Sequence, residues 1–398
     1  MGIFDWLKKI KKIIDHEINK GERKEDVINN NGENILYYNN GERCFEGFKK
    51  DGKETGLWKM YDRNGKINQE FNFNDKSGYS KIYSQNGSLF MEGGFSYKTI
   101  GFIVGGENFK DWKKQGKWKT YFENGKLENE TNFENGVEEG SYKLYFENGN
   151  LSFEGSMKNG EGNGYSKIYY ENGNLKGEGN NINGVFDGLS KEYYETGELL
   201  SEKQWKKNQL EGLSKEYYEN GNLYMEGLNK ENEKSGLWKI YYENGKLHGE
   251  KNFKNGKLEG FSKEYYENGK LQNESNCKKG NPEGLFKIYD ENGKLQKEGE
   301  MKNSKEHGTF KIYYENGQLK EESNWINGEL NGSSRSYFED GSLEEEGNYI
   351  NDKKEGEWRE EFSSNTEKRL TKVVNYVNDK IEGLKFIDEH GIEITPNE

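Results

Sequence analysis

Apolar and polar residues alternate in short runs along most of the chain, and turn residues separate the runs. One representative stretch, Gly236 to Gly256, reads GLWKIYYENGKLHGEKNFKNG. Its central Asn-Gly pair lies between two alternating runs, which favours a hairpin with a type I′ turn. A second turn at Asn255-Gly256 leads into the next stretch. The pattern predicts an antiparallel meander and shows no helical period between Gly32 and Ile394.

The runs form a repeat. Glycines recur in pairs nine residues apart, and from Gly116 the first glycine of each pair returns every 24 residues up to Gly356. A fixed period of this length indicates a repeat protein whose units pack mainly on their neighbours. We therefore expect an all-β, elongated, twisted antiparallel β-meander solenoid of about fifteen hairpin units over residues 25–394. The other expected segments are an insertion near residues 95–112, degenerate units near residues 356–391 and a tail at residues 395–398.

A fixed period also stacks equivalent side chains in columns. A cationic column runs from Lys119 to Arg359, and a glutamate column runs from Glu130 to Glu346. With a two-residue hairpin at Asn124-Gly125, Lys119 faces Glu130. Each such cross-strand pair stabilises the sheet by about 0.2–1 kcal/mol, so we interpret both columns as structural.

The opposite face is predicted to collect apolar side chains. A column beginning with Phe122 is expected to face one beginning with Leu127, and a third column begins with Phe133 and includes Cys277. A further tyrosine column falls on the charged face, with its hydroxyls left for water or a partner. A three-residue turn would reverse these faces. The tyrosines chosen as candidate partner-binding residues are Tyr169, Tyr193, Tyr217, Tyr241, Tyr265 and Tyr313.

Composition restricts the possible classes of function. The chain has 398 residues with a formal net charge of −13, and 30% of its residues are hydrophobic. Low hydrophobicity with high charge is typical of disorder, but an aromatic content of 14% argues against it. No run approaches the ~18 apolar residues of a membrane span. An acidic sheet lacks the basic footprint that nucleic acid requires, so basic proteins are the expected partners.

The unit G-x-W-K-x-Y-Y-E-N-G-K-L-x-x-E-x-N-F-K-N-G resembles the bacterial MORN-repeat variant found in YwqK-like antitoxin proteins. Gly236–Gly256 and Gly260–Gly280 match it most closely, and the resemblance extends from Gly32 to about Ile394. It implies a twisted single sheet, often with a helix or peptide in its aromatic groove. The resemblance to the antitoxin proteins implies that the chain binds and silences a partner polypeptide. The insertion at Ser96–Glu107 departs from the family pattern.

Residues 1–24 predict a short N-terminal amphipathic helix with a basic face. Three roles remain open for it: it could cap the open sheet edge, dock on a partner, or lie on an anionic membrane surface through residues 1–20. The apolar residues that would make the membrane or partner contact are Phe4, Trp6, Leu7, Ile10 and Ile14.

The repeat contains no recognisable catalytic constellation. Its four histidines are far apart and have no metal-ligand companions at the usual spacing, so we expect no metal and no cofactor. Cys277 stands where its equivalents are large hydrophobes, which favours a small buried thiol over a nucleophile. An enzyme hidden in the 95–112 insertion is the weakest alternative.

We therefore expect a non-enzymatic cytoplasmic scaffold, an antitoxin or inhibitor that captures a basic protein or peptide on an acidic aromatic ribbon. The alternative is a structural or adhesion protein held peripherally at the membrane through the N-terminal helix. The oligomeric state and the identity of the partner stay open.

Overall fold

The computed structural model describes residues 29–97, 112–363 and 369–394, and these residues form 31 strands and no helix. Neighbouring strands pair antiparallel in chain order, so the predicted all-β meander of hairpin repeats is confirmed. The predicted helix at residues 1–24, most of the 95–112 insertion and the tail at 395–398 lie outside the described residues. No helix in the described part is long and apolar enough to cross a membrane.

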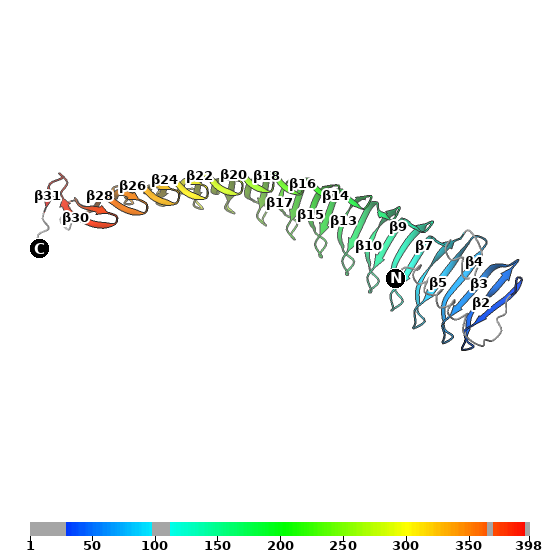
Figure 1. Cartoon of the computed structure of the whole chain (residues 1–398). Helices are drawn as coiled ribbons and strands as arrows, with labels where there is room; N and C mark the ends of the chain where they lie inside the picture. The colour runs from blue at the N-terminus through cyan, green and yellow to red at the C-terminus, as the bar shows by residue number, and fades with distance from the viewer. Residues whose placement is uncertain (1–28, 98–111, 364–368, 395–398) are drawn as a thin grey trace. The chain divides into compact units, whose positions relative to one another are not determined.

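The chain divides into two compact units, Met1–Leu199 with Trp205–Asn208, and Leu200–Gln204 with Gln209–Glu398. Within each unit consecutive strands lie side by side (Figure 1). The first unit contains β1 Gly32–Tyr37, β2 Arg43–Lys50, β3 Lys53–Tyr61, β4 Ile67–Asn74, β5 Ser77–Tyr83, β6 Leu89–Ser96, β7 Lys113–Tyr121, β8 Leu127–Glu134, β9 Val137–Tyr145, β10 Leu151–Lys158, β11 Glu161–Gly162, β12 Gly164–Tyr169, β13 Leu175–Ile182 and β14 Val185–Tyr193.

Residues of β15 Leu199–Lys206 belong to both units. The second unit continues with β16 Gln209–Tyr217, β17 Leu223–Lys230, β18 Glu233–Tyr241, β19 Leu247–Lys254, β20 Lys257–Tyr265, β21 Leu271–Lys278, β22 Asn281–Tyr289, β23 Leu295–Lys302, β24 Lys305–Tyr313, β25 Leu319–Ile326, β26 Glu329–Tyr337, β27 Leu343–Ile350, β28 Lys353–Ser363, β29 Arg369–Val377, β30 Lys380–Ile387 and β31 Glu393–Ile394.

The Asn-Gly hairpin is not the predicted type I′ turn. The Gly125 N–H donates to the Phe122 carbonyl at 2.9 Å, and the Phe122 N–H donates to the Lys126 carbonyl at 2.9 Å. Gly125 has a φ of 80°, whereas Asn124 is not in the left-handed region. The loop is therefore a type I turn followed by a left-handed glycine. The Asn124 side chain explains the difference, because its Oδ1 accepts the Lys126 N–H at 2.9 Å and stabilises this turn locally.

The type I′ turn occurs instead at the second loop of the repeat, as at Asn255-Gly256, although the loop Asp75-Lys76 does not adopt it. Asn255 and Gly256 have φ values of 50° and 69°, so both central residues are left-handed. Lys207 and Asn208 adopt the same conformation without a glycine, at 50° and 63°. The two loops of the repeat are thus built differently, although both contain asparagine.

The predicted strand register is correct on one side of a β-bulge and wrong on the other. Lys119 pairs with Glu130, as predicted, but the expected pairing of Phe122 with Leu127 is wrong, because Leu127 lies opposite Tyr121. The register shifts between Thr120 and Tyr121. The extra loop residue is absorbed by this bulge, which preserves the charge pairs and moves the leucine column beside the tyrosines.

The main buried cluster lies in the first unit. Phe45, Trp58, Phe71 and Phe95 are almost completely buried there, together with Cys44. Rings of this cluster contact one another edge-on and face-on; Phe71 and Phe95, for example, are 6.3 Å apart at an interplanar angle of 79°. Burial of these rings supplies the apolar stabilisation that a sheet of thin, charged repeats otherwise lacks.

Candidate functional site

The tyrosines predicted to bind a partner lie in one column, and their hydroxyls are already engaged. The Tyr169 hydroxyl donates to the Glu154 carboxylate at 2.7 Å. These hydroxyls thus donate to carboxylates of the sheet, whereas the sequence predicts that they are left for water or a partner. The equivalent pairs are Tyr193 with Glu178 at 2.8 Å, Tyr217 with Glu202 at 3.1 Å, Tyr241 with Glu226 at 3.1 Å, Tyr265 with Glu250 at 3.2 Å and Tyr313 with Glu298 at 2.8 Å.

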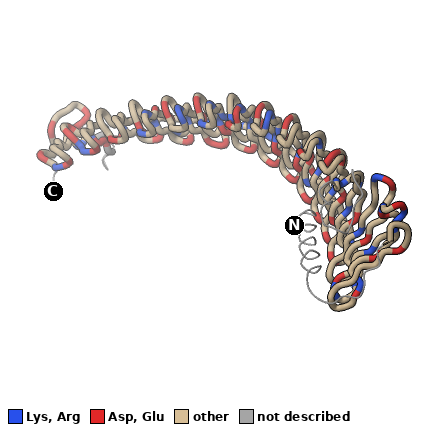
Figure 2. Tube along the Cα trace, turned by 45° about the vertical axis from the view of Figure 1, so that its right-hand side comes forward, with Lys and Arg blue, Asp and Glu red and all other residues tan. Residues whose placement is uncertain are grey.

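These contacts change the acid–base properties of both groups. Burial and the hydrogen bond to Glu154 raise the pKa of Tyr169 to about 12. The hydrogen bond from Tyr169 holds the pKa of Glu154 below its usual value. Lys143 lies 3.5 Å from the same carboxylate. Basic and acidic residues alternate along both units (Figure 2). Cross-strand ion pairs such as Lys215 with Glu226 and Lys287 with Glu298 repeat the arrangement, so the polar groups of this face mainly satisfy one another.

The other face of the sheet contains clusters of one lysine and two aromatic rings. The Lys234 Nζ lies 4.2 Å from the centre of the Trp238 ring and 5.5 Å from that of Phe253. Such cation–π contacts stabilise a folded chain by ~0.5–2 kcal/mol each. The same arrangement recurs with Lys114, Trp118 and Phe133, and with Lys354, Trp358 and Tyr376.

Each tryptophan of these clusters lies across a glycine of the preceding strand. A Cβ atom added to Gly227 would lie 2.3 Å from the Trp238 ring. The Trp238 indole N–H then reaches the Leu228 carbonyl at 3.0 Å. Gly93 with Trp118, and Gly347 with Trp358, repeat this close approach. Only glycine leaves space for an indole ring directly on the strand.

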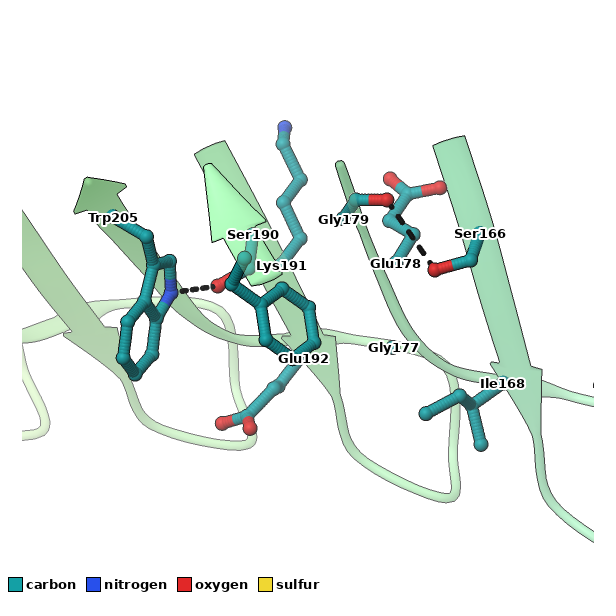
Figure 3. A pocket seen from close by; sticks show the side chains of 10 residues that line it. Ser166, Ile168, Gly177, Glu178, Gly179, Ser190, Lys191, Glu192 and Trp205 are labelled. Carbon is teal, nitrogen blue, oxygen red and sulfur yellow. Dashed lines mark hydrogen bonds between the residues drawn. The ribbon is translucent and has the colours of Figure 1, made fainter. Parts of the chain in front are cut away.

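The column that holds Trp118, Trp238 and Trp358 has serine in several repeats. These serines are Ser166, Ser190, Ser214, Ser262 and Ser334. Ser190 of β14 occupies the tryptophan position, and it pairs with Gly179 of β13. Phe186 stands at the lysine position, and Trp205 at the position of Phe253. The missing ring leaves a cavity of about 160 Å³ (Figure 3). Its lining residues are Ser166, Ile168, Gly177, Glu178, Gly179, Phe186, Ser190, Lys191, Glu192 and Trp205.

A hydrogen bond and a ring contact connect the walls of this pocket. The Trp205 indole N–H donates to the Ser190 hydroxyl at 2.8 Å, and the Trp205 and Phe186 rings lie 5.9 Å apart. Trp205, Ile168 and Glu192 point to one side of the sheet, while Glu178 and Lys191 point to the other (Figure 3). The pocket is thus an apolar slot with a glycine floor and an exposed carboxylate from Glu192 on its side of the sheet.

A second, wider hollow lies in the second unit. Its volume is about 550 Å³, and its lining includes Tyr266, Pro282, Phe286, Met301 and Phe310. The Phe286 and Phe310 rings are 5.5 Å apart. Here phenylalanines occupy the tryptophan column, so this hollow is a shallow groove beside a filled row.

The repeat matches a known family. The sequence model described as "MORN repeat variant" matches residues 54–75, 114–135, 138–159, 163–181, 186–207, 210–228, 234–255, 258–279, 282–303, 306–327 and 330–351. These segments cover more than half of the chain. The chain belongs to the MORN repeat variant family. The match establishes the repeat scaffold and does not extend to the antitoxin proteins.

Comparisons of whole proteins add little to this assignment. Comparison with curated proteins gives no match. Among solved structures, the chain is similar to TcdB2-TccC3 without its hypervariable C-terminal region, with 12% identity, a TM-score of 0.18, and coverage of 91% of this chain and 22% of that chain. It is also similar to the Tc holotoxin pore of Photorhabdus luminescens with the TccC3-D651A mutation, with 10% identity, a TM-score of 0.15, and coverage of 90% and 23%. The MORN-repeat chain therefore spans under a quarter of either protein.

The pocket was not predicted from the sequence, although the MORN repeats contain a signal for it. A glycine precedes the aromatic residue by eleven positions at Gly227 and Trp238, and again at Gly347 and Trp358. Two serines break that rule, Ser190 with Gly179 and Ser166 with Gly155, because the glycine is kept while the ring is absent. Comparing the two columns across repeats marks both positions, and the contact of Trp238 with Gly227 shows what the columns mean.

Cys277 is half-buried among the MORN repeats, at a position opposite Gly260 and Pro282. Burial raises the pKa of its thiol. The thiolate is therefore scarce near neutral pH, in keeping with the structural role expected from the sequence.

Proposed function

We propose that this MORN-repeat chain is a non-enzymatic scaffold that captures a polypeptide. The observation that supports the proposal is the pocket beside Trp205, which lies on the aromatic face among repeats of the same design. Equivalent side chains recur along each unit of the sheet, and a polypeptide is the kind of ligand that can contact several of them in succession. A small molecule would use one repeat only.

The partner in this proposal is a basic protein or peptide. The net charge of −13 favours attraction of a cationic chain and speeds its encounter at low salt. The array would then act as an inhibitor or antitoxin by holding that chain on the aromatic face. The tyrosine column contributes indirectly, since its hydrogen bonds to glutamates such as Glu178 keep neighbouring strands in register.

Affinity capture from the native cell, with the full chain as bait, tests the proposal. We expect one basic protein to be retained in a fixed ratio to the bait and to be released as salt is raised, because salt screens the attraction. Retention of no protein in fixed ratio would contradict the proposal. If the released protein poisons the cell when expressed alone, the antitoxin role is supported.

A further inference from the structure

We infer that the pocket over Gly177 and Gly179 binds one aromatic side chain of the partner, a tryptophan flanked by lysine or arginine. The inference deepens the proposed function and rests on it. Equivalent positions in other repeats of the chain show which side chains a glycine in this column can hold.

The filled repeats supply the template. At Trp238 the ring lies directly on Gly227, with its N–H donated to the carbonyl of the next residue, Leu228, at 3.0 Å. At Trp358 the ring lies on Gly347, and its N–H is donated to the Asn348 carbonyl at 3.1 Å. The Phe310 ring lies on Gly299 in the same way, so an aromatic ring, most often an indole with one backbone acceptor, covers the glycine in these filled repeats.

The vacant repeat retains the floor and lacks the ring. Gly179 takes the place of Gly227, and its neighbour Asn180 supplies the equivalent carbonyl. An added Cβ at Gly179 would lie 3.3 Å from the Phe186 ring and from Ser190, whereas one at Gly227 would lie 2.3 Å from the Trp238 ring, so the nearest ring leaves more space over Gly179. A cavity of about 150 Å³ holds a benzene-sized group, and this one, at about 160 Å³ and open on one side, has room for an aromatic ring.

The surroundings favour a cation beside that ring. In the filled repeats a lysine of the chain covers the indole, as Lys234 covers Trp238 at 4.2 Å. Phe186 replaces this lysine in the vacant repeat and leaves an apolar wall that packs on Trp205. The covering cation must then come from the partner, and the exposed carboxylate of Glu192 lies on the same side of the sheet (Figure 3).

The test uses the full chain and two synthetic peptides of equal charge. One is Lys-Lys-Trp-Lys-Lys with blocked ends, and the other has alanine in place of tryptophan. The protein carries ¹⁵N in its indole groups, so that the Trp205 N–H, which donates to Ser190, reports on the pocket. We expect the tryptophan peptide to bind at least about tenfold more tightly and to shift the Trp205 signal.

Two variants fill the pocket and one serves as a control. Ser190→Trp supplies the missing ring from the chain, and Gly179→Val occupies the floor, so both should reduce the preference for tryptophan to within about twofold. Leu189→Trp adds the same ring at the neighbouring residue. Successive side chains of a strand point to opposite faces, so Leu189, which is 44% exposed, points away from the pocket, and this variant should keep the full preference for tryptophan. Cooperative unfolding of each variant confirms that it folds.

Several outcomes would overturn the inference. They are equal affinity for the two peptides, a preference that survives in both pocket-filling variants, and a Trp205 shift produced by raising the concentration of the protein alone, which would indicate a second copy as the occupant. If neither peptide binds while native capture retains a partner, the inferred tryptophan site is wrong and the proposed scaffold function is supported. If the peptides bind but no native partner is captured, the proposed function fails instead.

Discussion

The phenol hydroxyl of Tyr241 donates a hydrogen bond to the Glu226 carboxylate, fifteen residues earlier in the chain, at 3.1 Å. Glu226 also pairs across the strands with Lys239. Because Glu226 and Tyr241 belong to consecutive repeats, the contact joins one repeat to the next. The charged face is therefore a source of cohesion between repeats.

Removing one such hydroxyl should weaken the junction between two repeats. Tyr241→Phe is expected to lower the free energy of unfolding by about 1 kcal/mol, the usual net value of one hydrogen bond. Urea unfolding measures the change. Tyr224→Phe is the matched control, because the Tyr224 ring packs edge-on against Tyr218 at 5.0 Å and keeps that contact without its hydroxyl. Equal effects in the two variants would contradict the role of the Glu226 contact.

Alkaline pH should unfold the array through the same column. Burial, with the hydrogen bond to a glutamate, raises the pKa of Tyr169, Tyr217, Tyr241 and Tyr313 to about 12 from an unfolded value of 10. A phenol whose pKa is higher in the folded protein than in the unfolded chain contributes its full stabilisation below pH 10. This stabilisation is lost as the pH rises through 12. Phenolate absorbance should appear together with loss of strand signal. Titration of these tyrosines near pH 10 without unfolding would refute the prediction.

Two glycine substitutions should separate filled from vacant repeats. Gly227→Ala places a Cβ 2.3 Å from the Trp238 ring, so we expect a loss of about 1–3 kcal/mol from overpacking. Gly179→Ala meets Phe186 and Ser190 at 3.3 Å, and neighbouring side chains can yield by that amount at a cost below ~1 kcal/mol. Thermal unfolding compares the two variants. A Gly179→Ala variant as unstable as Gly227→Ala would show that the pocket is not a real vacancy.

The hairpin glycine allows a test of how far damage spreads. Gly245 has a φ of 82°, and Gly245→Val forces a β-branched residue into that region at a cost of about 1–3 kcal/mol. Since repeats mainly contact their neighbours, faster hydrogen exchange should stay within β17 to β20. Uniformly faster exchange throughout the described strands would contradict this nearest-neighbour behaviour.

The repeat, the strands and the charge pairs could be predicted from the sequence, because the spacing of glycines and the alternation of apolar and polar residues depend directly on backbone geometry. Asn124 misled the prediction of the turn, since its side chain caps a right-handed turn while Asn255 adopts the left-handed one. The extra loop residue and its compensating bulge then moved Leu127 beside Tyr121. Hairpin loop length is decided by such local hydrogen bonds, and strand periodicity does not encode them.

Prediction of the pocket required knowledge of side-chain contacts between neighbouring strands. Ser190 and Gly179 are unremarkable as single residues, and their meaning emerges only when Trp238 on Gly227 shows what the position holds elsewhere. The tyrosine column was predictable as a column, but its hydrogen bonds to glutamates of the preceding repeat depend on the bulged register.

Hydrogen exchange of the full chain, alone and with its captured partner, tests the central claim most directly. The account predicts that the partner slows exchange most strongly in β12 to β14 and at Trp205, around the vacant ring position, and that Ser190→Trp removes this local protection. Protection confined to other strands, or an unchanged exchange pattern in the presence of a bound partner, would contradict it.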